Sequence, residues 1–132
     1  MSNQKLACID VGLKRIGLAT CLASDIVTPQ DAIIRKNRNQ ASREVDEFLT
    51  EWEIDKLIVG LPQDSHTSQD MQNRIKHFAG LLKFTGEIAY MDESFSSYEA
   101  KEMMKGKVKQ KRDGRIDSIS AQIILQRYLG VI

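Results

Sequence analysis

The fold of this chain is decided by residues 6–21, LACIDVGLKRIGLATC. The apolar run that begins at Leu6 predicts a buried strand, and a second run begins at Ile16, so soon afterwards that the two predict a hairpin. Gly12 lies in the turn between them, and Asp10 ends the first strand. A carboxylate at the end of a buried strand is costly unless something pairs with it. A purely turn-capping role would also explain Asp10, because Asp before a turn glycine is common in hairpins.

Composition indicates one globular domain spanning residues 1–132. The chain has 132 residues, of which 42% are hydrophobic and 28% are charged, a balance typical of water-soluble folds with one core. Nineteen Lys and Arg residues oppose eighteen Asp and Glu residues, so net charge predicts no particular partner. Cys8 and Cys21 fall in the expected strands, and the sequence shows no secretory signal and no membrane-length apolar run. We therefore expect a cytoplasmic protein without a membrane partner.

Beyond the hairpin, strand and helix patterns alternate along the chain. They predict strands at Asp31–Ile34, Lys56–Gly60 and Ile88–Met91, and helices from an Asn37 or Asn39 cap to about Glu53, from near Ser68 until Gly86, from Ser96 to Met104 and from Ile116 to Leu129. The run at 56–60 lacks polar alternation, which is typical of a parallel strand buried on both faces. Right-handed crossovers then make the last two strands parallel. The expected fold is α/β: a mixed sheet of three antiparallel strands followed by two parallel strands, flanked by helices.

Three acidic residues stand where they could meet at the carboxyl edge of this sheet. Asp10 and Glu93 end two apolar strands, and Asp117 shares a side of the last helix with Ala121 and Ile124, a side that should pack on the sheet. An N-cap role would explain where Asp117 lies along the helix but not the face it occupies. With no basic partner expected on the neighbouring strand, the three carboxylates would repel one another. Mg²⁺ or Mn²⁺ would relieve that repulsion, because both ions prefer oxygen ligands.

Such a site favours phosphodiester cleavage, since two ions about 4 Å apart can activate a water and stabilise the leaving oxygen. A zinc site is not indicated, because His66 and His77 lack ligand spacing and are interpreted as surface residues. Residues 105–115 form a strongly basic run, which would hold a phosphate-bearing substrate near the site. Its basic members are Lys105, Lys107, Lys109, Lys111, Arg112 and Arg115. The run predicts a charged loop that either contacts phosphates or is only a solvated linker.

Four motifs stand in order around these acids. They are DVGLKRIGLA at 10–19, IVGLP at 58–62, DE at 92–93, and IDS at 116–118 followed by Ala121 and LQRYL at 125–129. Together they resemble the YqgF family of Holliday-junction resolvases and pre-16S ribosomal RNA nucleases, and the resemblance covers nearly the whole chain. It implies a ribonuclease H-like fold. It also implies that Asp10, Glu93 and Asp117 are the catalytic acids and hold Mg²⁺ or Mn²⁺.

The resemblance implies a metal-dependent endonuclease that processes the 5′ end of pre-16S rRNA. The alternative is a Holliday-junction resolvase, which would need two sites and therefore a homodimer. Phosphate contacts are expected from Lys14 and Arg15 in the hairpin and from Lys107, Lys109, Lys111 and Arg112 in the basic run. The sequence alone does not choose between structured RNA and branched DNA, because such contacts read phosphates and not bases.

Two departures from the family pattern concern substrate positioning. Leu13 stands where the family usually has Thr, and Ser94 stands where it usually has Arg, so Lys14, Arg15 or the basic run would have to supply that charge. Two other classes fit less well. An actin-like ATPase needs two domains and a second Asp-Gly loop, which 132 residues do not supply. A nucleic-acid-binding module without catalysis would gain nothing from three acids.

Overall fold

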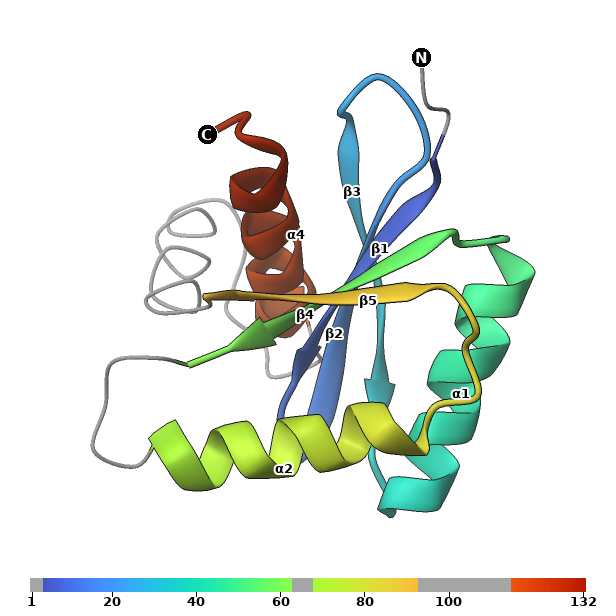
Figure 1. Ribbon diagram of the computed structural model, residues 1–132, viewed down its shortest axis with the longest axis vertical. Helices are drawn as coiled ribbons and strands as arrows, with labels where there is room; N and C mark the ends of the chain where they lie inside the picture. The colour runs from blue at the N-terminus through green and yellow to red at the C-terminus, as the bar shows by residue number, and fades with distance from the viewer. Residues whose placement is uncertain (1–3, 63–67, 93–114) are drawn as a thin grey trace.

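A computed structural model describes residues 4–62, 68–92 and 115–132 (Figure 1). Its strands are β1 (Leu6–Val11), β2 (Arg15–Cys21), β3 (Val27–Ile34), β4 (Lys56–Leu61) and β5 (Glu87–Asp92), and its helices are α1 (Arg38–Glu51), α2 (Ser68–Leu81) and α4 (Arg115–Leu129). The five strands form one sheet in the order β3-β2-β1-β4-β5. β1, β2 and β3 pair antiparallel, whereas β1 with β4 and β4 with β5 pair parallel. The mixed sheet expected from the sequence is therefore confirmed.

The helices cover the two faces of this sheet separately. Figure 1 shows α1 and α2 on one face and α4 on the other. Side chains alternate along a strand, so β1 contributes to two cores. Ala7, Ile9 and Val11 pack in the core beneath α1 and α2, whereas Leu6 and Cys8 pack in the core beneath α4. By the same alternation, Asp10 projects from the α4 face.

β4 lies between β1 and β5 and is buried on both faces. Leu57, Val59 and Leu61 pack toward α1 and α2, and Ile58 packs toward α4. All four are at most 5% exposed, which explains why this strand reads as a continuous apolar run.

A capping box fixes the start of α1. The Asn37 side chain accepts a hydrogen bond from the Gln40 backbone N–H at 2.8 Å, and the Gln40 side chain accepts one from the Asn37 backbone N–H at 3.3 Å. Two backbone donors that the helix leaves unpaired are thereby satisfied. Of the two caps offered by the sequence, Asn37 is the correct one.

Two expected boundaries are wrong. β3 begins at Val27 rather than Asp31, because it pairs with β2 as far as Cys21 although Thr28 and Pro29 are exposed. Helix α2 ends at Leu81, so Gly86 does not close it, and Gly86 does not have the positive φ expected of a helix-ending glycine. A Cβ at Gly86 would instead lie 2.4 Å from the Asp55 carbonyl oxygen, so glycine there permits a close backbone approach.

Two further expectations concern the end of the chain. Arg115, expected within the basic loop, is the first residue of α4. The helix expected at Ser96–Met104 lies outside the described residues. Within the part of the chain that the structure describes, no helix is long and apolar enough to cross a membrane.

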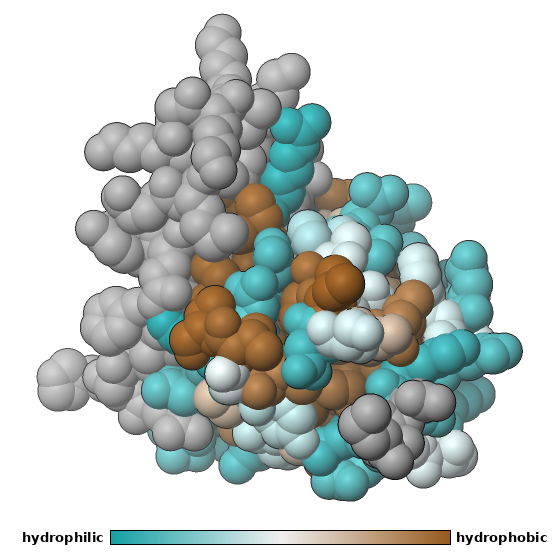
Figure 2. All heavy atoms as spheres, turned by 90° about the horizontal axis from the view of Figure 1, so that it is seen from above, coloured by the Kyte–Doolittle hydropathy of each residue, from teal (hydrophilic) through white to brown (hydrophobic). Residues whose placement is uncertain are grey.

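Exposed apolar side chains gather at the end of the sheet opposite the β1–β2 turn. They include Leu22 and Ile26 between β2 and β3, and Val131 and Ile132 after α4. Figure 2, which views this end, shows apolar side chains interspersed with polar ones. These residues lie away from the carboxyl edge of the parallel strands, where the expected site is located.

Candidate active site

Asp10 lies near the carboxyl end of β1, half-buried on the α4 side of the sheet. Its partner across the antiparallel ladder is Gly17 on β2. β1, β4 and β5 are parallel, so their carboxyl ends share one edge. Asp92 ends β5 at this edge. Glu93 follows Asp92 in the chain and lies outside the described residues, so its role stays a prediction.

Gly17 allows the first turn of α4 to lie directly on β2. A Cβ at Gly17 would sit 2.0 Å from the Asp117 carbonyl oxygen and 2.8 Å from the Ser118 backbone nitrogen, closer than real atoms approach. The backbone of Asp117 therefore rests on the residue that pairs with Asp10. This contact brings the two acids, far apart in the sequence, to neighbouring positions on one face of the sheet.

Ser118 anchors the same turn of α4 through a buried hydrogen bond. Its Oγ accepts from the Leu18 backbone N–H at 3.3 Å, where the β2–β3 ladder shifts register between Ile16 and Leu18. Ser118 is only 3% exposed, and Ala121 and Ile124 beside it are fully buried. No local sequence pattern predicts that Ser118 is buried or that it bonds to β2.

Arg15 forms an ion pair with Asp117. The Arg15 Nε donates to Asp117 Oδ2 at 2.8 Å, and the two side chains are 24% and 29% exposed. The expectation that the acids have no basic partner on the neighbouring strand is therefore wrong for Asp117. Arg15 was expected to contact substrate; here it holds the carboxylate, and a substrate contact stays a prediction.

Backbone and side-chain hydrogen bonds brace the β1–β2 turn. The Gly12 N–H donates to the Arg15 carbonyl at 2.9 Å, and the Arg35 N–H donates to the Lys14 carbonyl at 2.9 Å. The Arg35 Nη1 also donates to the Gly12 carbonyl at 2.6 Å. Its guanidinium lies over the Phe78 ring, 5.3 Å from the ring centre. The residue after β3 thus fixes the turn that follows Asp10, a role that the sequence did not reveal.

The other expected site residues divide into two groups. Lys14 is exposed in the braced turn, and His77 is exposed on α2, which confirms the surface interpretation of this histidine. The remainder lie outside the described residues: His66, Ser94, Lys107, Lys109, Lys111 and Arg112. Among residues 4–62, 68–92 and 115–132 there is no group of three acidic, histidine or cysteine side chains that could hold a metal ion.

Known proteins resemble this chain along nearly its whole length. A family model described as "RuvX: Holliday junction resolvase" matches residues 4–130. A Sulfurovum sp. (strain NBC37-1) protein is 58% identical over 127 residues, covering 96% of this chain and 99% of the relative. A Sulfurimonas denitrificans protein is 56% identical over 125 residues, covering 95% and 96%. Both relatives carry the name "Putative pre-16S rRNA nuclease".

Solved structures share the fold at low sequence identity. RuvC from T. thermophilus, in complex with a Holliday junction substrate, aligns with a TM-score of 0.61 at 12% identity and covers 96% of both chains. The fowlpox virus Holliday junction resolvase aligns with a TM-score of 0.56 at 13% identity, covering 98% of this chain and all of the other. The ribonuclease H-like architecture implied by the motifs is therefore confirmed.

Proposed function

Because this chain belongs to the RuvX family of Holliday junction resolvases, we propose that it is a nuclease that hydrolyses phosphodiester bonds with Asp10, Glu93 and Asp117 as its catalytic acids. One observation carries the assignment: α4 rests on Gly17, the residue that pairs with Asp10, so that Asp117 lies beside Asp10.

The described donor set fits a hard divalent cation. Asp10 and Asp117 offer carboxylate oxygens from half-buried positions on one face of the sheet, and Mg²⁺ and Mn²⁺ prefer such ligands. Bound there, the metal would activate a water and stabilise the leaving oxygen. Asp10, Asp117 and Glu93 would hold it.

Arg15 would orient Asp117 within this site. Its Nε–H fixes one carboxylate oxygen, and a guanidinium carries further N–H donors that can bind a phosphate oxygen. Arg15 could therefore supply charge that other family members take from the arginine replaced here by Ser94. Lys14, on the same braced turn, and Lys107, Lys109, Lys111 and Arg112 would add contacts to the phosphate backbone.

Precursor 16S rRNA is the proposed substrate, because the relatives named for it are 58% and 56% identical across nearly their whole length. Branched DNA is the second candidate, supported by the description of the matching family. Cutting both strands of a junction would require a second active site, and so a homodimer.

One assay tests both candidates. Labelled precursor rRNA fragments and four-way DNA junctions are incubated side by side with Mg²⁺, Mn²⁺ or EDTA, and the Asp10→Asn variant serves as the control for contaminating nucleases. We expect cleavage of the RNA that requires metal and is lost in the variant. Cleavage of the junction alone would favour the second candidate. Cleavage of both substrates by Asp10→Asn at the parent rate would contradict the assignment of Asp10 as a catalytic acid.

A further inference from the structure

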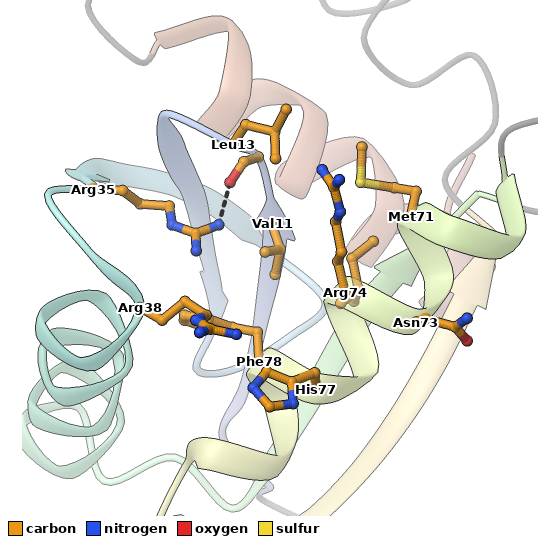
Figure 3. A pocket seen from close by; sticks show the side chains of 11 residues that line it. Val11, Leu13, Arg35, Arg38, Met71, Asn73, Arg74, His77 and Phe78 are labelled. Atoms are coloured by element: carbon orange, nitrogen blue, oxygen red, sulfur yellow. Dashed lines mark hydrogen bonds between the residues drawn. The ribbon is translucent and has the colours of Figure 1, made fainter.

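A cavity lies on the other side of β1 from Asp10. It has a volume of about 370 Å³ and lies between the β1–β2 turn, the start of α1 and α2 (Figure 3). Val11, Leu13, Met71 and Ile75 supply its apolar lining. Cavities of this size hold small organic ligands. Val11 follows Asp10 directly, so the cavity and the candidate active site flank the same end of β1.

Three arginines give this cavity a strong positive charge. Arg35, Arg38 and Arg74 all line it, and no acidic side chain does. None of the ion pairs found among the described residues involves these three arginines. Partial burial and the nearby Arg38 charge lower the pKa of Arg35, as expected where like charges gather. An anion would relieve this repulsion, and guanidinium groups bind phosphate oxygens in pairs of parallel hydrogen bonds.

The cavity also offers surfaces for a flat ring. Arg35 is held over Phe78 and by the Gly12 carbonyl, so its guanidinium plane is fixed (Figure 3). Unpaired bases stack on such planes. Leu13 is 63% exposed at the rim, so its side chain is accessible to a ligand in the cavity. A ligand that carries both a phosphate and an aromatic ring matches this arrangement.

We propose that this cavity binds one unpaired nucleotide of the nucleic-acid strand, with its phosphate on Arg38 and Arg74 and its base between Arg35 and Leu13. The inference rests on the proposed nuclease function, and it adds a specificity: the strand must be single-stranded at this position. Adjacent strand residues point to opposite faces. A strand that passes around the end of β1 therefore reaches Asp10 on one face and the cavity on the other.

Binding measured without metal separates this proposal from catalysis. Fluorescence anisotropy in EDTA measures the affinity for a labelled single-stranded RNA and for a fully paired duplex. Three proteins are compared: the parent, a double variant carrying Arg38→Gln and Arg74→Gln, and the single variant Arg43→Gln. Arg43 is an exposed α1 arginine paired with Glu47 and lies outside the cavity, so it is the matched control. Arg38 and Arg74 are exposed, so the double variant should fold normally, which its melting curve checks.

The double variant should bind single-stranded RNA at least about tenfold more weakly than the parent, because charge-assisted hydrogen bonds are lost. Duplex binding should change far less, and Arg43→Gln should match the parent. In cleavage assays the double variant should raise KM and leave kcat unchanged. Leu13→Ser should weaken single-strand binding without changing its salt dependence, since an apolar contact releases no counterions.

These measurements distinguish a nucleotide within an RNA strand from a free nucleotide. They also separate failure of the cavity proposal from failure of the proposed nuclease function. Single-strand binding equal to the parent in the double variant would overturn the proposal, even if the parent cleaves RNA. If a mononucleotide binds the parent but not the double variant, while the two proteins bind RNA equally, the ligand of the cavity is a free nucleotide. That result would contradict binding of a nucleotide within a strand. If the double variant loses single-strand binding but the parent cleaves neither substrate, nucleotide binding in the cavity is supported and the proposed nuclease function is contradicted.

Discussion

Arg15 on β2 and Asp117 on α4 are 102 positions apart in the sequence, yet Nε and Oδ2 lie 2.8 Å apart. The pair joins the turn after the first strand to the first turn of the last described helix. An ion pair this exposed contributes about 0–1 kcal/mol to stability. Its importance is geometric, because it orients a carboxylate at the edge of the sheet where Asp10 lies.

Removing the charge of any of the three proposed catalytic acids should abolish cleavage. Asp10→Asn, Glu93→Gln and Asp117→Asn preserve side-chain shape but lose the charge that a divalent cation needs, so the rate should fall by orders of magnitude. Circular dichroism should show a folded protein in each case. Cleavage by any of these variants at the parent rate would show that the substituted residue is not a catalytic acid.

Gly17→Ala should destabilise the protein and reduce cleavage together. The new Cβ would meet the rigid backbone of Asp117, not a movable side chain, so α4 must shift. We expect a loss of about 1–3 kcal/mol in the free energy of unfolding, as for other overpacked contacts.

Gly80→Ala is the matched control for this substitution. Gly80 lies in the last turn of α2, and a Cβ there would meet no atom of another element within 4 Å. Alanine should therefore not destabilise the protein and should stabilise the helix by at most about 0.5–1 kcal/mol, the value for a helix interior. Urea unfolding of both variants checks the contrast. Equal effects at the two glycines would show that α4 does not rest on β2 as described.

Divalent cations should stabilise the folded protein without any substrate. A ligand present at a hundredfold excess over its Kd stabilises the state it binds by about 2.7 kcal/mol, which should raise Tm by several degrees in a domain of this size. Thermal melts in EDTA and in millimolar Mn²⁺ measure the shift. Asp10→Asn should respond much less, whereas Asp31→Asn, which changes an exposed β3 acid, should respond like the parent. An unmoved parent curve would contradict a metal site.

The basic run should set the salt dependence of substrate binding. Neutralising Lys107, Lys109, Lys111 and Arg112 removes phosphate contacts, and each lost contact should reduce the slope of log affinity against log salt by about 0.9 on duplex DNA and about 0.7 on single strands. Titrations at several salt concentrations measure this slope. An unchanged slope in the fourfold variant would identify the run as a linker.

Much of the fold could be predicted from local patterns. Apolar runs located β1, β2 and β4, and in α1 the apolar residues Ala41, Val45 and Leu49 recur at helical spacing and are buried. The start of β3 was missed, because the edge residues Thr28 and Pro29 carry no strand pattern. Asn37 and Asn39 were equivalent caps in the sequence, and the reach of Gln40 decided between them.

The candidate site was harder to predict, because its contacts join distant segments. The helical period placed Asp117 on the side of Ala121 and Ile124 and so toward the sheet, but no local pattern could pair it with Arg15. Gly17 was expected only as a strand residue, and its need to be glycine appears only when α4 is in place. The arginine cavity combines a turn, a strand end and a helix, and no single motif marks it.

The contact between Gly17 and Asp117 also has a consequence for protein synthesis. Asp10 leaves the ribosome long before Asp117, and the two acids become neighbours only when α4 docks across β2. Contacts between such distant segments form late, since a long loop must close first. A nascent chain that has folded only its first strands therefore holds Asp10 alone, and the proposed site is assembled only after the last helix has been synthesised and has docked.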